Sequence, residues 1–224
     1  MKVVYCANRA IYRQMPTAIN SLLSNNKVEK IYLLIEDDTI DYINHPCIEF
    51  INLNQFDFII RDGFNCTNKF PYMAMVRCVL SKILTENKVL YLDVDTIVDG
   101  SIADLWNYNL SGNPIAGRVE QGDYINSGVL LMDLAQIRGC KYDDRLLDLL
   151  KRCRFVFPDQ DAINIIFKNR ITRLPDYYNK IDRDVVYDSG DVVIRHFAGV
   201  VKPWKENATE KDKAIWNKYK VDHI

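Results

Sequence analysis

The chain has 224 residues, 48% of them hydrophobic, and its 29 lysine and arginine residues nearly balance its 30 aspartate and glutamate residues, for a net charge of −1. This length and composition indicate one globular domain with a full core and exclude a disordered chain. The balanced charge argues against general nucleic-acid binding, which usually needs a basic surplus. It is compatible with a small anionic ligand held by a local cluster of cations.

Predicted strands and helices alternate along the chain. Short buried apolar runs predict strands at residues 3–6, 31–35, 48–53, 89–92, 128–132 and 192–194. Apolar residues at helical spacing predict helices at residues 15–23, 73–84, 143–153 and 159–167. This alternation indicates an α/β fold with a mainly parallel central sheet. Ligands of such sheets bind outside the carboxyl ends of the strands, where the strand order changes direction.

Features of the sequence that report on its compartment favour the cytoplasm. The apolar run after Met1 stops before Asn8, too early for a signal peptide, and no stretch is long enough for a transmembrane helix. Six cysteines without C-x-x-C spacing argue against a zinc ribbon, so we expect free, mostly buried thiols. Residues 205–224 mix lysines with acidic residues, which leaves membrane association unsupported. We expect them to form a helical tail packed on a domain of residues 1–204.

The clearest motif is a pair of aspartates, Asp93 and Asp95, directly after an apolar strand. Side chains alternate along a strand, so the two carboxylates are expected on the same side. They would repel each other without a cation, and Mn²⁺ or Mg²⁺ suits oxygen ligands. A solvated turn is the plainer interpretation. A strand followed by D-x-D-x-[TV] is also the nucleophile motif of haloacid-dehalogenase-like phosphatases, but Ile97 takes the last position and such motifs normally open their domain.

A second motif, H-x-x-G-x-x-K, follows the last predicted strand and consists of His196, Gly199 and Lys202. A neutral imidazole can join two carboxylates on Mn²⁺. Gly199 would let the backbone approach a phosphate, whose charge Lys202 could neutralise. A lone histidine is more simply a core or surface residue, but that interpretation leaves the spacing of Gly199 and Lys202 as a coincidence.

Several other polar residues lie beside predicted apolar elements. Gln160 and Asp161 follow Asp159 at a predicted helix start, where capping accounts for Asp159 but not for Gln160. Asn126 precedes a predicted strand and could offer its amide to sugar hydroxyls. Arg77 lies within a predicted helix, where reaching to water is the simpler interpretation.

Together and in this order, these segments resemble family 8 of the glycosyltransferases, the group of glycogenin and the bacterial lipopolysaccharide galactosyl- and glucosyltransferases. The resemblance extends from Val3 to Trp204 and is most specific in L-Y-L-D-V-D, which ends at Asp95, and in H-x-x-G-x-x-K-P-W, which ends at Trp204. It implies a glycosyltransferase A (GT-A) fold, a single Rossmann-like nucleotide-binding domain. It also implies a UDP-sugar donor, Mn²⁺ and retention of the anomeric configuration.

The resemblance assigns roles to individual residues. The family's metal ligands match Asp93, Asp95 and His196, and its diphosphate contacts match Gly199 and Lys202. The residues expected around uracil, ribose and the transferred sugar are Ala7, Asn8, Tyr12, Arg77, Asn126, Gln160 and Glu120. Among these, Tyr12, as a stacking partner of the base, and Glu120, as a contact of donor hydroxyls, fit the family pattern less closely.

Catalysis is expected to depend on Asp95, Gln160 and Asp161. The departing diphosphate gains negative charge, so cations placed beside it in advance lower the barrier. The amide of Gln160 is a poor nucleophile, which favours front-face attack with the phosphate accepting the proton of the acceptor hydroxyl. Covalent catalysis by Asp161 or Asp159 is the alternative.

The predicted donor is of the UDP-glucose or UDP-galactose type, and N-acetyl forms are equally compatible. A glycan, a lipid-linked glycan and a protein are all compatible acceptors. The sequence is also compatible with assembly of this chain into a homo-oligomer. A non-catalytic nucleotide-sugar binding module is the alternative function.

Overall fold

The structure, a computed structural model, describes residues 1–181 and 192–224. Its centre is a seven-stranded sheet with the order β3-β2-β1-β4-β7-β6-β8. The strands are β1 (Lys2–Cys6), β2 (Lys30–Ile35), β3 (Ile48–Asn52), β4 (Lys88–Leu92), β6 (Ile115–Gln121), β7 (Tyr124–Asp133) and β8 (Ile171–Leu174). Strands β1 to β4 are parallel, and β7 runs antiparallel to both of its neighbours. The predicted α/β fold with a mainly parallel sheet is therefore confirmed.

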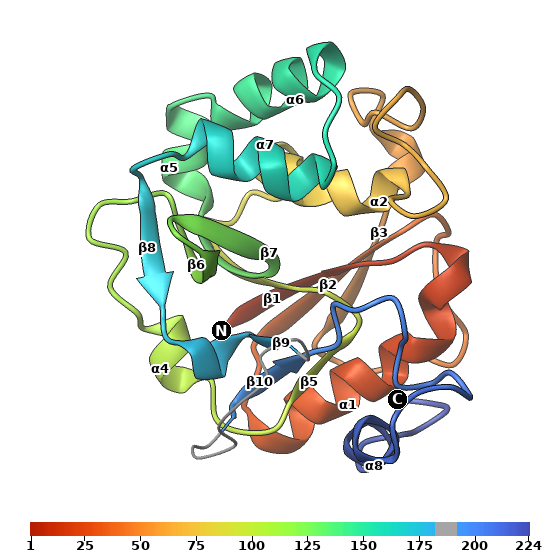
Figure 1. The fold of residues 1–224 in the computed structure, drawn as a ribbon. Coiled ribbons are helices and arrows are strands. Elements are labelled where there is room, and N and C mark those ends of the chain that lie inside the picture. The colour runs from red at the N-terminus through yellow and green to blue at the C-terminus, as the bar shows by residue number, and fades with distance from the viewer. Residues whose placement is uncertain (182–191) are drawn as a thin grey trace.

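Helices cover both faces of this sheet (Figure 1). One face carries α2 (Tyr72–Met75), α3 (Leu80–Ile83), α5 (Leu134–Gly139), α6 (Tyr142–Arg152) and α7 (Pro158–Ile166), and the other carries α1 (Met15–Asn25). In β1, Val4 and Cys6 belong to the first of the two cores, and Val3 and Tyr5 belong to the second. Central strands are thus apolar on both sides, which is why they are continuous apolar runs in the sequence.

The prediction of one helix at residues 73–84 is wrong in one respect, because the structure breaks this segment into three helical pieces. Between α2 and α3 lies a 3₁₀ turn, η3 (Val76–Val79). Arg77 in this turn donates from Nε to the carbonyl of Ala74 at 2.9 Å. In a continuous α-helix that carbonyl would accept from the backbone of Cys78. The break thus coincides with a side chain that takes over a helical acceptor.

A second, smaller sheet has the order β5-β10-β9. Its strands are β5 (Thr96–Val98), β9 (Lys180–Ile181) and β10 (Ile194–His196). Sequence analysis placed the last strand at residues 192–194 and did not predict β5, β6, β8 or β9. Strands β5 and β9 have only three and two residues, and strands of that length carry little periodic signal. Strand β10 pairs antiparallel with β5, and His196 lies opposite Thr96. This pairing brings the histidine motif beside the two aspartates.

The remaining helical elements are η1 (Arg9–Gln14), η2 (Leu53–Gln55), α4 (Ala103–Trp106), η4 (Asp176–Tyr178) and α8 (Glu210–Asn217). Helix α8 begins at the cap residue Thr209, which accepts from the backbone of Asp212. Its Trp216 packs on Trp204 and Phe197, with ring centroids 4.8 and 6.1 Å apart, respectively. The segment after residue 204 therefore lies against the second sheet, next to His196.

Two sequence predictions concern features outside the sheets. All six cysteines are free, as predicted, but only Cys6 and Cys78 are buried, so the expectation of mostly buried thiols is wrong. Within the described ranges, no helix has both the length and the apolar character that crossing a membrane requires.

Candidate metal-binding active site

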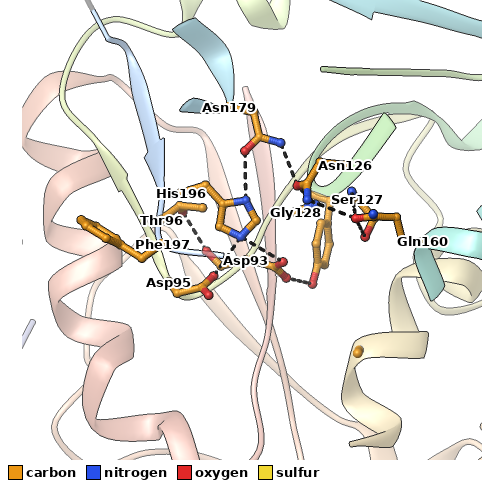
Figure 2. Close-up of polar contacts among 12 residues, drawn as sticks. Asp93, Asp95, Thr96, Asn126, Ser127, Gly128, Gln160, Asn179, His196 and Phe197 are labelled. Atoms are coloured by element: carbon orange, nitrogen blue, oxygen red, sulfur yellow. Dashed lines mark hydrogen bonds and ion pairs between the residues drawn. The ribbon is translucent and has the colours of Figure 1, made fainter. Parts of the chain in front are cut away.

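Three potential metal ligands meet at the carboxyl end of β4. Asp93 and Asp95 follow this strand, His196 ends β10, and one ligand atom from each lies within 4.8 Å of the others (Figure 2). The imidazole Nε2 lies 3.3 Å from Asp95 Oδ1 and 3.7 Å from Asp93 Oδ2. The strand order changes direction between β1 and β4, so the cluster occupies the place where such sheets bind ligands.

The two aspartates converge for a different reason than predicted. Strand β4 ends at Leu92, and residues 93–96 form a turn in which Thr96 donates from its backbone and from Oγ1 to the carbonyl of Asp93. Strand alternation therefore does not align the carboxylates. The turn carries both of them toward His196, and the pairing of β5 with β10 holds the histidine opposite.

Arg77 and Tyr91 position the carboxylate of Asp93. Arg77 donates from Nη2 to Oδ1 at 2.7 Å and from Nη1 to Oδ2 at 3.2 Å, and the Tyr91 hydroxyl donates to Oδ1 at 2.7 Å. Arg77 is only 5% exposed, and its guanidinium lies 4.5 Å from the centre of the Tyr91 ring. A bidentate pair of this kind fixes the orientation as well as the charge of the carboxylate.

Asp159 is a second buried partner of Arg77. Its Oδ2 lies 3.2 Å from Arg77 Nε and accepts from Ser127 Oγ at 2.8 Å. Burial raises the pKa of Asp159, and the attraction of Arg77 opposes that rise. Arg77 thus joins the first turn of α7 to the end of β4.

Asp95 has a cationic neighbour of its own. Lys202 donates from Nζ to Asp95 Oδ2 at 2.6 Å and to the carbonyl of Phe197 at 2.7 Å. Burial alone would raise the pKa of Asp95, but His196 in its protonated form and Lys202 bring it below its usual range. Asp95 is therefore ionised at neutral pH, as a metal ligand must be. Gly199 lies in open space, since an added Cβ would meet only Val201 O, at 3.9 Å.

Gln160 and Asp161, both predicted to act in catalysis, have different surroundings. Gln160 Oε1 accepts from Asn126 Nδ2 at 3.1 Å and from Ser127 N at 3.0 Å, and its Nε2 donates to Glu120 at 3.1 Å. Asp161 accepts from three donors, the backbone amides of residues 156 and 157 and the hydroxyl of Tyr124. The carboxylate of Asp161 thus fixes the backbone of the two residues that directly precede α7.

The residues expected around the nucleotide lie at the ends of β1 and β2. Ala7 is buried and donates from its backbone to Leu34 O at 3.1 Å, and Asn8 precedes η1. Tyr12 accepts from the backbone amide of Glu36 at 2.9 Å, and burial raises its pKa to about 12. These positions adjoin the end of β4 because β1 pairs with β4.

Sequence analysis gave no role to three residues of the site: Tyr91, Gly128 and Asn179. A Cβ at Gly128 would overlap the His196 ring at Cε1 and lie 2.8 Å from Asp93 Oδ2. A glycine inside a strand often marks such a close approach, so that signal was present. Asn179 is fully buried, and its Oδ1 lies 3.0 Å from His196 Nδ1. It has no local motif that could have indicated this contact.

A Rossmann-like sheet with this cluster at the switch in strand order defines the glycosyltransferase A class of folds. The chain belongs to glycosyl transferase family 8, whose model matches residues 2–208. Glycosyltransferase GlyE of Streptococcus pneumoniae is 29% identical over an alignment 249 residues long, gaps included. This alignment covers 98% of this chain and 60% of GlyE. The lipopolysaccharide 1,2-glucosyltransferase of Escherichia coli is 29% identical over 153 residues, which cover 54% of this chain and 45% of that protein.

Solved structures have the same fold. The crystal structure of GlyE superposes with a TM-score of 0.79 at 25% identity, covering 97% of this chain and 59% of that one. The galactosyltransferase LgtC, in complex with donor and acceptor sugar analogues, also gives 0.79 at 20% identity, covering 99% of this chain and 97% of LgtC. This chain spans between 30% and 61% of the length of the streptococcal glycosyltransferases that it matches.

Proposed function

We propose that this chain is a retaining glycosyltransferase that moves a hexose from a UDP-sugar to an acceptor hydroxyl and requires Mn²⁺. The observation that carries the proposal is the convergence of Asp93, Asp95 and His196 within 4.8 Å, with Lys202 bonded to one of the carboxylates. Membership of family 8 supports it. Relatives described as a glucosyltransferase and a galactosyltransferase support a hexose donor.

The residues present fit a divalent cation. Two carboxylates and an imidazole suit Mn²⁺, whereas Mg²⁺ favours an all-oxygen set and is the second choice. The His196 nitrogen that faces the carboxylates is Nε2, while Nδ1 already contacts Asn179. When bound, the ion would supply positive charge beside the diphosphate leaving group.

The chain's own residues would bind and orient the donor. Lys202 would exchange Asp95 for a phosphate oxygen, and the open backbone at Gly199 would let the diphosphate approach. Ala7, Asn8 and Tyr12, at the ends of the adjoining strands, would contact the uridine. At the sugar, Asn126 and Gln160 would contact hydroxyls, while Arg77 would act by holding Asp93 in place.

The surroundings of the carboxylates near Gln160 support front-face attack over covalent catalysis. Asp161 accepts from two backbone amides and Tyr124, and Asp159 is bonded to Arg77 and Ser127, so neither carboxylate is poised as a nucleophile. In the proposed reaction the bond from the anomeric carbon to the phosphate oxygen breaks, and the acceptor oxygen bonds to that carbon on the same face. The acceptor proton passes to the departing phosphate.

Calorimetry of UDP binding, with and without Mn²⁺, tests the proposal. Wild-type protein should bind UDP only with the ion, and Asp95→Asn should lose this binding without a change in fold, measured by circular dichroism. Equal, metal-independent binding by both proteins would refute the proposal. A panel of UDP-sugars then identifies the donor by thermal shift, since ligand at about 100 times its Kd adds about 2.7 kcal/mol of stability.

Turnover separates the proposed enzyme from its alternatives. Release of UDP from a UDP-sugar in the presence of an acceptor glycan, lipid-linked glycan or protein supports transfer. Stabilisation by ligand without any turnover would instead indicate a binding module. Phosphatase activity is not expected, because Arg77 and Tyr91 hold the Asp93 carboxylate that would have to act as the nucleophile.

A further inference from the structure

A chain of buried side-chain amides connects His196 to Gln160 (Figure 2). Asn179 Oδ1 lies 3.0 Å from His196 Nδ1, and Asn179 Nδ2 donates to Asn126 Oδ1 at 3.0 Å. Asn126 Nδ2 in turn donates to Gln160 Oε1 at 3.1 Å. The potential metal ligand and the glutamine expected beside the sugar thus belong to one hydrogen-bond network.

Two backbone amides determine the direction of this network. Side-chain contacts alone do not, because the oxygen and nitrogen of an amide can exchange places. Gly128 N donates to Asn126 Oδ1 at 3.0 Å, and Ser127 N donates to Gln160 Oε1 at 3.0 Å. A backbone N–H can only donate, so Asn126 must direct its oxygen toward Gly128. The group of Asn179 that contacts this same oxygen must then be its NH₂.

The orientation of Asn179 determines the tautomer of His196. With its NH₂ on Asn126, Asn179 presents its carbonyl oxygen to His196 Nδ1. That oxygen can only accept, so Nδ1 must carry the hydrogen. A neutral imidazole has one N–H, which leaves Nε2 with a free lone pair. Nε2 is the nitrogen that faces Asp93 and Asp95.

We propose that Asn179 is a positioning residue that holds His196 in the Nδ1–H tautomer and so presents the Nε2 lone pair to a metal ion. Metal-bound histidines usually donate their second ring N–H to an oxygen acceptor, which fixes the ring and makes it a better ligand. Only the role toward metal rests on the proposed function, because the tautomer follows from the protein's own hydrogen bonds.

Nuclear magnetic resonance of the histidine ring nitrogens tests the tautomer directly. The chain has three histidines, so His45→Gln and His223→Gln variants assign the signals of a ¹⁵N-histidine-labelled, metal-free sample. At a pH where the ring is neutral, His196 should show a protonated Nδ1 and a bare Nε2. In Asn179→Leu it should shift toward the Nε2–H form, which predominates in water. Asn179→Asp keeps an acceptor and should keep the Nδ1–H form.

Metal affinity supplies the second measurement. Asn179→Leu should bind Mn²⁺ about 10- to 100-fold more weakly by calorimetry, as for other residues that support a ligand. Asn65→Leu is the matched control, because Asn65 is also buried but bonds Leu150 and Cys153, away from the site. It should lose stability while His196 and Mn²⁺ binding stay unchanged.

Three results are decisive. An Nε2–H tautomer in the wild type would overturn the proposal, even if Asn179→Leu does not fold. An unchanged tautomer together with unchanged Mn²⁺ affinity in a folded Asn179→Leu would also overturn it. A wild type that shows the Nδ1–H tautomer but binds no Mn²⁺ would refute the proposed function and leave the assignment of the tautomer to Asn179 standing.

Discussion

Lys202 donates from Nζ to Asp95 Oδ2 at 2.6 Å, so a cation of the protein itself neutralises one of the two carboxylates. A divalent ion at the same carboxylate would be repelled by this ammonium group. The diphosphate of a bound nucleotide would instead attract the ammonium group of Lys202. The bond between Lys202 and Asp95 therefore opposes metal binding without nucleotide and favours it with nucleotide.

Lys202→Met should separate these two effects. Without the competing cation, Mn²⁺ alone should bind roughly 30-fold more tightly, corresponding to about 2 kcal/mol for a single and a double positive charge about 4 Å apart in water. UDP should bind roughly 10-fold more weakly, because a charge-assisted bond to phosphate is lost. Uridine, which lacks phosphates, should be little affected. Calorimetry measures all three ligands, and equal losses for UDP and uridine would show that Lys202 is structural.

Gly128→Ala should disrupt the ligand cluster. The added Cβ would overlap the His196 ring and lie 2.8 Å from Asp93 Oδ2, so at least one ligand must move. We expect the loss of Mn²⁺-dependent UDP binding and about 1–3 kcal/mol of destabilisation from overpacking. Gly139→Ala is the control, since nothing lies within 4 Å of its added Cβ. Wild-type binding by Gly128→Ala would contradict the close packing at this position.

Arg77→Met should destabilise the fold as well as the site. It leaves the carboxylates of Asp93 and Asp159 without their shared partner, and breaking a buried ion pair usually costs about 3–5 kcal/mol. Urea unfolding without metal measures the free energy of unfolding. Arg152→Met removes an exposed pair with Asp148 and should cost less than about 1 kcal/mol. Similar losses in both variants would argue against the central role of Arg77.

Gln160→Ala should lower the transfer rate by a factor on the order of 10–100, as expected for one electrostatic contact rather than an essential nucleophile. The product of an α-linked donor should stay α-linked, which nuclear magnetic resonance of the product determines. Inversion would rule out the retaining assignment. A sugar adduct on Asp161 or Asp159 in mass spectrometry would replace front-face attack with covalent catalysis.

The contact between the C-terminal segment and Asp99 should make stability depend on pH. Burial would raise the pKa of Asp99, but Lys218 and the hydroxyl of Tyr219 bring it below its ordinary value of 3.8. A carboxyl whose pKa is lowered by folding stabilises the fold above its unfolded pKa, and this stabilisation is lost as the pH falls through the folded pKa. Asp99→Asn should therefore be less stable than wild type at pH 7, with a smaller difference at pH 3. Urea unfolding at both pH values measures this, and a constant difference would contradict it.

The sequence by itself determined five of the seven strands of the central sheet, all but β6 and β8, and the order of its motifs. Strands β1, β2 and β4 are buried on both faces, so they form apolar runs that are recognisable without any tertiary information. The aspartate pair and the H-x-x-G-x-x-K spacing are likewise local patterns, and their order along the chain was enough to indicate the family. The boundaries of α1, α6 and α7 were predicted to within two residues, whereas Arg77 interrupts the helix predicted at residues 73–84, and α4 and α5 were not predicted.

The tertiary structure decided how these motifs meet. Asp95 and Lys202 are 107 positions apart, and what brings them together is the pairing of β10 with β5, a strand too short to leave a periodic signal. Tyr91, Gly128 and Asn179 became visible only because a carboxylate and an imidazole pack against them. The physical reason is that periodicity reports burial within a single element. Which side chains share a buried hydrogen bond depends on how separate elements pack.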